Sequence, residues 1–144
     1  NLRDDRTFFL DAMEWDDQAL KYAGEGLRDD REIVLTAIQP GPAPFEYASE
    51  RLRGDRATVL AAVALWGHAV QFASEELRGD REVILAAVEQ DGRALRFASE
   101  DLWDDRDFVL EIVGRYGWLL SAIRGTDLRC DCEVIRRAVA VDDM

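Results

Sequence analysis

Residues 77–101 read LRGDREVILAAVEQDGRALRFASED, and close variants of this stretch recur along almost the whole chain. Each copy opens with a leucine, at Leu2, Leu27, Leu52, Leu77 and Leu102, and Leu128 follows after one inserted residue. This period of 25 residues lies in the range used by stacked helical repeats. We therefore predict one repeat array over 1–144, with units at 2–26, 27–51, 52–76, 77–101 and 102–127 and a partial unit at 128–144.

The first helix of each unit is predicted to begin near the recurring Asp-Arg pair. Asp29 and Glu32 fit a capping-box pattern, and Asp104 and Asp107 offer a weaker version. An Asp at a helix N-terminus accepts hydrogen bonds from free N–H groups and meets the positive end of the helix dipole. Apolar residues follow at helical spacing on one stripe, for instance Val83, Ile84, Ala87 and Val88.

A glycine then separates this helix from a shorter second one. Gly67, Gly92 and Gly117 recur where a helix C-terminus favours a left-handed residue. We predict a second helix such as 93–100, with Ala94, Leu95, Phe97 and Ala98 facing inward. Neither helix can bury its apolar stripe alone, so the prediction is an all-α fold of helix-turn-helix repeats stacked as a short α-solenoid.

Two segments depart from the pattern. Pro40-Gly41-Pro42-Ala43-Pro44 replaces the end of one helix and the start of the next, and proline is excluded from helix interiors. We interpret it as a local kink and not as a domain boundary. The last unit carries an inserted Asp127 and ends without its second helix, as a terminal cap or a continuing chain would.

The Asp-Arg pairs form a ladder with one rung in each unit. Its members are Asp5, Arg6, Asp30, Arg31, Asp55, Arg56, Asp80, Arg81, Asp105 and Arg106. The ladder could grip a charged partner. We favour a structural role, in which each Asp caps a helix and each Arg bridges to an acidic residue of a neighbouring unit, because a charge present in every unit serves something that every unit needs.

The residue types that carry catalysis are sparse. Serines recur at Ser49, Ser74 and Ser99, but His68 is the single histidine and is interpreted as a surface or cap residue. Cys130 and Cys132 are poorly placed to bridge each other, and they lack the further ligands that a zinc site needs. We therefore predict no catalytic residue, no metal site and no cofactor.

The composition of the chain argues against a nucleic-acid-binding protein and against a membrane-spanning one. Of 144 residues 30 are acidic and 18 basic, for a net charge of −12, which disfavours binding to a phosphate backbone. No apolar run is long enough to span a bilayer, and no signal peptide is recognisable at the N-terminus. We expect a soluble chain in a reducing compartment, the cytoplasm or an organelle interior.

Aromatic residues that do not follow the repeat are the candidate interface anchors. Trp103 takes the position of the usual arginine after the repeat leucine and is the first choice if it is exposed. Phe45 in the proline segment is second, and Trp15 and Trp66 lie at helix-end turns. Tryptophan is enriched at the energetic centres of protein interfaces. Buried packing is the default interpretation of the tryptophans, and the interface role applies to those that are exposed.

The pattern L-R-x-D-R-E-x-V-L-x-A-V-x-x-x-G-x-A-L-x-F-A-S-E is matched best by residues 52–76 and 77–101. It resembles the uncharacterised helical repeat called domain of unknown function 4116, which occurs in arrays in bacterial effector-like proteins and in proteins of protists and algae. The resemblance covers about residues 1–140. It implies helical repeats and a protein-interaction role, and it provides no catalytic residues to transfer.

We expect a non-enzymatic interaction or scaffold module, such as an accessory subunit docked at the edge of a larger assembly. The algal members of the resembling family make an organellar or photosynthetic complex a candidate. One alternative is a ligand-binding or enzymatic domain with its chemistry in a groove or in flanking regions outside this sequence. The other is an acidic mimic of nucleic acid, which requires the acidic residues to gather along one face.

Overall fold

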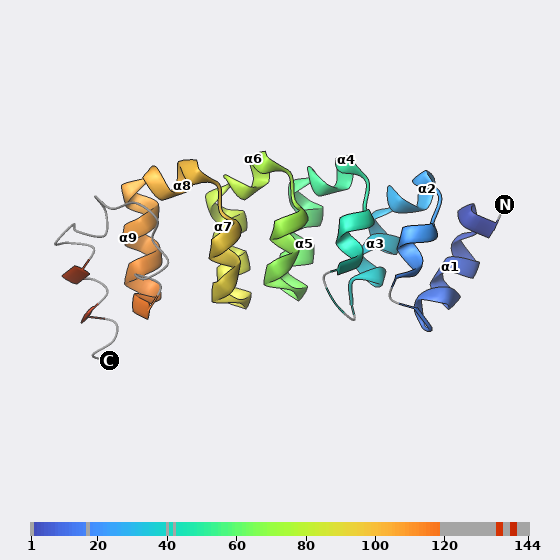
Figure 1. Cartoon of the computed structure of the whole chain (residues 1–144), viewed down its shortest axis with the longest axis horizontal. Helices are drawn as coiled ribbons and strands as arrows, with labels where there is room; N and C mark the ends of the chain where they lie inside the picture. Colours follow the sequence, from blue (N-terminus) through green and yellow to red (C-terminus); the bar gives the residue numbers. More distant parts are fainter. Residues whose placement is uncertain are drawn as a thin grey trace.

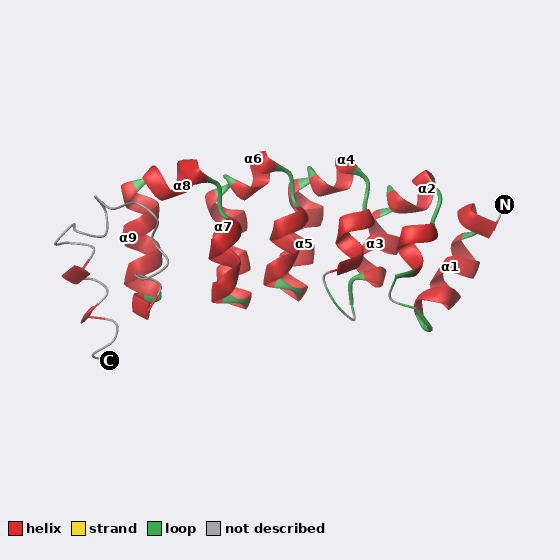
Figure 2. Ribbon diagram, in the orientation of Figure 1, coloured by secondary structure: helices red, strands yellow, loops and turns green. Residues whose placement is uncertain are grey.

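The computed structural model describes residues 2–16, 18–39, 41, 43–118, 135–136 and 139–140. Within these residues every regular element is helical and no strand occurs, as Figure 2 shows. The prediction of an all-α array of stacked repeats is confirmed. Each complete unit contributes a long α-helix, and the predicted second helix is divided into a 3₁₀ helix and a short α-helix.

The long helices stand side by side in chain order, and the short helices follow one edge of the row (Figure 1). The long helices are α1 (Arg6–Met13), α3 (Arg31–Ala37), α5 (Arg56–Leu65), α7 (Arg81–Gln90) and α9 (Arg106–Arg115). The short helices are α2 (Glu25–Arg28), α4 (Glu50–Arg53), α6 (Glu75–Arg78) and α8 (Glu100–Asp104). The 3₁₀ helices are η1 (Leu2–Asp4), η2 (Ala19–Tyr22), η3 (Ala43–Tyr47), η4 (Gly67–Phe72) and η5 (Gly92–Phe97).

Each long helix is capped by the second aspartate of its unit. Asp30 has an extended backbone, and its carboxylate accepts hydrogen bonds from the N–H groups of Glu32 at 3.0 Å and Ile33 at 3.3 Å. Asp5, Asp55, Asp80 and Asp105 cap their helices in the same way. The predicted caps Asp29 and Asp104 were therefore one residue too early. Asp29 instead ends α2 and turns its carboxylate toward α4.

The repeated glycines allow close approach between units. No described residue has a positive φ, so the prediction of left-handed helix ends was wrong. A Cβ atom at Gly67 would lie 2.4 Å from the carbonyl oxygen of Ala87 in α7, and one at Gly92 would lie 2.5 Å from the Trp118 ring. Glycine is required at Gly67 because the next unit packs directly against its backbone.

A hydrogen bond between units explains why the predicted second helix is split. The backbone of Ala98 and Ser99 is extended, so η5 stops at Phe97 and α8 starts at Glu100. The freed N–H of Ser99 donates to the carbonyl oxygen of Arg78 at 3.0 Å, at the end of the preceding short helix. The interruption joins successive short helices, and it recurs at Ser49 and Ser74.

The core is continuous from Phe9 to Val113 and includes the residues on both sides of the proline segment. The residue three positions after each capping Asp is fully buried at Ile33, Thr58, Val83 and Phe108. At the same position in α1, Phe8 is 45% exposed, because nothing in the described chain packs against that side of the helix. Each unit therefore buries its apolar stripe against its neighbour.

Candidate functional site

The structure places the Asp-Arg ladder between units, in contacts that hold the array together. Arg56 donates through Nε to Asp80 at 2.9 Å and also bridges to Glu82, and Arg6 and Arg81 bridge to acidic residues of the following long helices. Burial raises the pKa of Asp80, but its hydrogen bonds with Arg56 and with backbone N–H groups outweigh this effect and lower the pKa overall. The ladder is thus occupied by contacts within the chain.

The candidate interface aromatics divide into buried and exposed residues. Trp103 is only 4% exposed and Phe45 is fully buried, so neither can anchor a partner on this surface, and these two predictions were wrong. Both are bulky apolar side chains in the common core. Trp66 is partly buried against that core, and Trp15 is 88% exposed.

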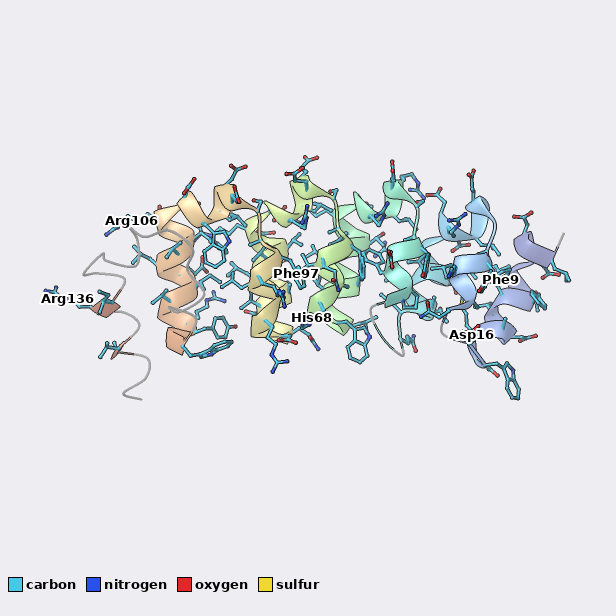
Figure 3. The ribbon with its side chains drawn as sticks, in the orientation of Figure 1. Phe9, Asp16, His68, Phe97, Arg106 and Arg136 are labelled. Carbon is cyan, nitrogen blue, oxygen red and sulfur yellow. The ribbon has the colours of Figure 1, made fainter. Side chains whose placement is uncertain are left out.

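The candidate chemical groups lie apart from one another. His68 pairs through Nδ1 with Asp91 of the following unit at 3.0 Å, and its ring meets Phe97 edge to face at 5.8 Å. Figure 3 labels His68 and Phe97. Ser49, Ser74 and Ser99 lie at the starts of short helices on the other edge of the row. Cys130 and Cys132 lie outside the described residues. No group of acidic, histidine or cysteine side chains fit to hold a metal occurs in the described part of the chain.

The short helices form one continuous edge, which we call the ridge: α2, α4, α6 and α8 with Ser49, Ser74 and Ser99. The N–H of each serine donates to the last carbonyl oxygen of the preceding short helix, at 2.8 Å from Ser49 to Arg28 and 2.9 Å from Ser74 to Arg53. The hydroxyl groups of Ser49 and Ser74 cap the next helix. Because the helices are linked end to end, equivalent side chains recur along the ridge at the spacing of the units.

Three arginines at equivalent positions end the first three ridge helices, and we call Arg28, Arg53 and Arg78 the arginine row. The Nε atom of each is buried and has no hydrogen-bond partner. None of these side chains makes an ion pair or a hydrogen bond with another residue in the described part of the chain. A buried donor without a partner costs about 1–3 kcal/mol relative to a satisfied one. The row is thus a recurrent polar feature that makes no side-chain contact of this kind within the described chain.

Sequence reasoning overlooked this row, although its signal was present. An arginine follows the repeat leucine at Arg3, Arg28, Arg53 and Arg78, with the same period as the ladder. The ladder attracted attention because its Asp and Arg are adjacent in the sequence. Aspartate follows Arg3 and Arg28, but glycine follows Arg53 and Arg78, so in those two units the recurrent arginine has no adjacent acidic partner.

Two grooves open along the ridge around these arginines. The groove between α2 and α4 has a volume of about 680 Å³ and is lined by Arg28, Arg53, Tyr47, Ser49, Glu25 and Glu50, among others. The groove between α6 and α8 has a volume of about 660 Å³ and is lined by Arg78, Ser99, Glu75, Glu76, Glu100 and Asp101, among others. Each groove therefore contains unpaired arginine and unpaired carboxylate groups together.

The first groove also contains a hydrogen-bonded cluster around the Asp29 carboxylate, which the second groove lacks. Arg51 donates through Nε to both carboxylate oxygens of Asp29, at 2.9 and 3.0 Å, and Ser49 donates its hydroxyl proton to the same carboxylate. The hydrogen bonds from Arg51 and Ser49 hold the pKa of Asp29 below its usual value. Glycine replaces this aspartate at Gly54 and Gly79, and the Ser99 hydroxyl is left without a partner.

Glutamates form a second row, which begins each ridge helix. Glu25, Glu50, Glu75 and Glu100 are exposed, and their carboxylates make no hydrogen bond or ion pair within the described chain. Figure 3 shows oxygen-tipped side chains that project outward along this edge. We call these four residues the glutamate row. The ridge therefore has unpaired guanidinium groups and unpaired carboxylates side by side along its grooves.

These features define an all-α tandem-repeat protein in which equivalent polar groups are displayed once per unit along one edge. The chain matches the domain of unknown function DUF4116 at residues 5–53, 41–78, 55–103 and 80–124, and it belongs to that family. The matches at 5–53 and 55–103 each span about two of the 25-residue units. No curated protein and no solved structure matches the chain. None of the described helices is long and apolar enough to cross a bilayer.

Proposed function

We propose that the chain is a non-enzymatic protein-interaction module that binds a segment of a partner protein along the ridge. The observation that carries this proposal is the arginine row, whose side chains line the grooves of the ridge and make no hydrogen bond or ion pair in the described chain. The other recurrent charges, those of the ladder, are used between units. A repeated donor that the fold leaves free is suited to a ligand that extends across several units.

The charge balance supports a protein partner and argues against nucleic acid. The net charge is −12, and the glutamate row adds free carboxylates next to the arginine row. A phosphate backbone would be repelled along the ridge. The proposal includes the role of an accessory subunit held by a larger assembly. The proposal also places the chain in a reducing compartment, which is supported by two cysteines too close in sequence to bridge each other.

Selection of random peptides on the immobilised full chain tests this proposal without knowledge of the native partner. We expect enriched peptides whose binding is lost in the triple variant Arg28→Gln, Arg53→Gln, Arg78→Gln. The matched control is Lys21→Gln, Arg93→Gln, Arg96→Gln, which removes three exposed charges from the 3₁₀ helices and leaves the ridge intact.

If the triple variant loses its helical circular dichroism, a second measurement on the otherwise unchanged chain replaces it. A photo-crosslinking residue at Glu76, exposed on the ridge, is compared with one at Glu14, exposed at the end of α1. Crosslinks from position 76 and not from 14 support the proposal. If no peptide is enriched, or if the enriched peptides crosslink equally at both positions, the ridge is not a binding surface and the proposal is wrong.

A further inference from the structure

We infer that the ridge takes one kind of partner, an extended segment that carries a basic side chain at about every third residue. This inference rests on the proposed function and specifies the chemistry of the partner. Three observations lead to it: the free carboxylates of the glutamate row, the free donors of the arginine row, and the regular spacing of both along the ridge.

The glutamate row sets the sign of the partner's side chains. Glu25 and Glu50 line the same groove as Arg28, and Glu75, Glu76, Glu100 and Asp101 line the groove that holds Arg78. An acidic segment placed against these arginines would meet free carboxylates on both sides. Lysine or arginine side chains would instead pair with carboxylates that have no partner within the described chain. The net charge of −12 also accelerates encounter with a basic segment.

The arginine row then requires acceptors that are not side-chain carboxylates. The main-chain carbonyl oxygens of an extended partner meet this requirement. A helical partner uses its carbonyl oxygens in its own hydrogen bonds, whereas an extended partner leaves them free. Half-buried guanidinium groups in the grooves can donate to such carbonyls, as Arg51 does to the carbonyl oxygen of Asp29 at 3.0 Å. The Tyr47 ring, which lines the first groove, offers an apolar surface beside them.

The spacing of the units determines the sequence period of the partner. Packed helices stand about 8–10 Å apart. A polyproline II segment rises about 3.1 Å per residue and completes a turn in about three residues, so every third side chain faces the same way about 9 Å further on. One turn of such a segment therefore spans one unit. The four members of the glutamate row correspond to a segment of about ten residues.

Fluorescence anisotropy with three labelled peptides tests the inference on the full chain. The probes are (Lys-Ser-Pro)₄, the acidic (Glu-Ser-Pro)₄, and a peptide of the first composition with its lysines contiguous. We expect the periodic lysine peptide to bind most tightly, and its Kd to rise about tenfold in Glu50→Gln/Glu75→Gln. The control Asp11→Asn/Glu14→Gln changes the net charge equally on the exposed side chains of α1 and is expected to leave that Kd within about twofold.

Three results overturn the inference: tighter binding of the acidic peptide, equal binding of the periodic and contiguous lysine peptides, or equal effects of the two double variants. The random-peptide selection described above distinguishes failure of this inference from failure of the proposed function. Ridge-dependent peptides that are acidic or helical would refute the basic extended partner while the interaction function stands. Absence of any ridge-dependent peptide would refute both.

Discussion

Replacement of Gly67 by alanine tests the close packing between units most directly. A Cβ atom at this position would lie 2.4 Å from the carbonyl oxygen of Ala87 and 3.0 Å from the backbone nitrogen of Asp91. Both atoms belong to backbone at the end of α7 and in the residue that follows it, so no side-chain rotation can relieve the contact. The two units would have to separate by about 1 Å to restore an ordinary contact distance.

The expected cost follows from three contributions. Overpacking of a tight contact costs about 1–3 kcal/mol. Separation would also lengthen the 2.8 Å hydrogen bond from the Gly67 N–H to Gln90 Oε1, and such bonds contribute about 1 kcal/mol. Against this, alanine loses less backbone entropy on folding, by less than about 1 kcal/mol. We expect Gly67→Ala to lower the free energy of unfolding by about 2 kcal/mol and the Tm by about 4–8 °C.

Urea and thermal unfolding followed by circular dichroism measure both quantities. Gly26→Ala is the matched control, because Gly26 lies in α2 and no atom lies within 4 Å of its added Cβ. We expect this control to stabilise the chain by up to about 1 kcal/mol, since alanine favours helix. If Gly67→Ala unfolds at or above the wild-type temperature, or if both variants lose the same stability, the close approach is not what requires glycine at position 67.

Three further predictions concern the caps, the acidic groups and the end of the array. Asp55→Ala should lower the free energy of unfolding by about 1–3 kcal/mol, because the Thr58 N–H and the buried Thr58 hydroxyl both lose their acceptor. Adding Thr58→Val should restore part of this free energy, as measured by urea unfolding. Hydrogen bonds from Arg51 and Ser49 lower the folded-state pKa of Asp29, and those from Thr58 lower that of Asp55. The stability that these two ionised carboxylates contribute is therefore complete above about pH 4 and is lost as the pH falls. Asp29→Asn should make the decline of Tm at acidic pH less steep. Phe108→Ala should cost about 3–5 kcal/mol, whereas Phe8→Ala at the half-exposed position should cost much less, and equal losses would contradict the packing described for α1.

The repeat and its core could be predicted from the sequence because both depend on local periodicity. Val83, Ile84, Ala87 and Val88 were assigned to one buried stripe by their helical spacing, and all four are buried. The all-α fold followed, since such stripes must pack against one another. These predictions needed no knowledge of which residues meet across units.

The features that sequence reasoning missed depend on contacts between units. The break before Ser99 depends on a hydrogen bond to the carbonyl oxygen of Arg78, and no local pattern indicates this bond. Gly67 was interpreted through its own φ, whereas the structure shows that its neighbour in space requires it. Trp103 was a candidate interface anchor only if exposed, and it lies in the core. The recurrence of the arginine row is present in the sequence, but its lack of partners depends on contacts between units.

A periodic surface faces a problem of register, because a periodic partner could shift by one unit and find equivalent contacts. The ridge contains two departures from periodicity that oppose such a shift. At one end the Asp29 carboxylate is held by Arg51 and Ser49, where the next two units have glycine, at Gly54 and Gly79. At the other end the arginine row stops, because Trp103 takes the next equivalent position and is buried. A partner displaced by one unit would leave a free arginine at one end and would find no equivalent arginine at the other, where Trp103 is buried. On the proposed mode of binding, the repeats therefore provide affinity and the departures from the repeat fix the register.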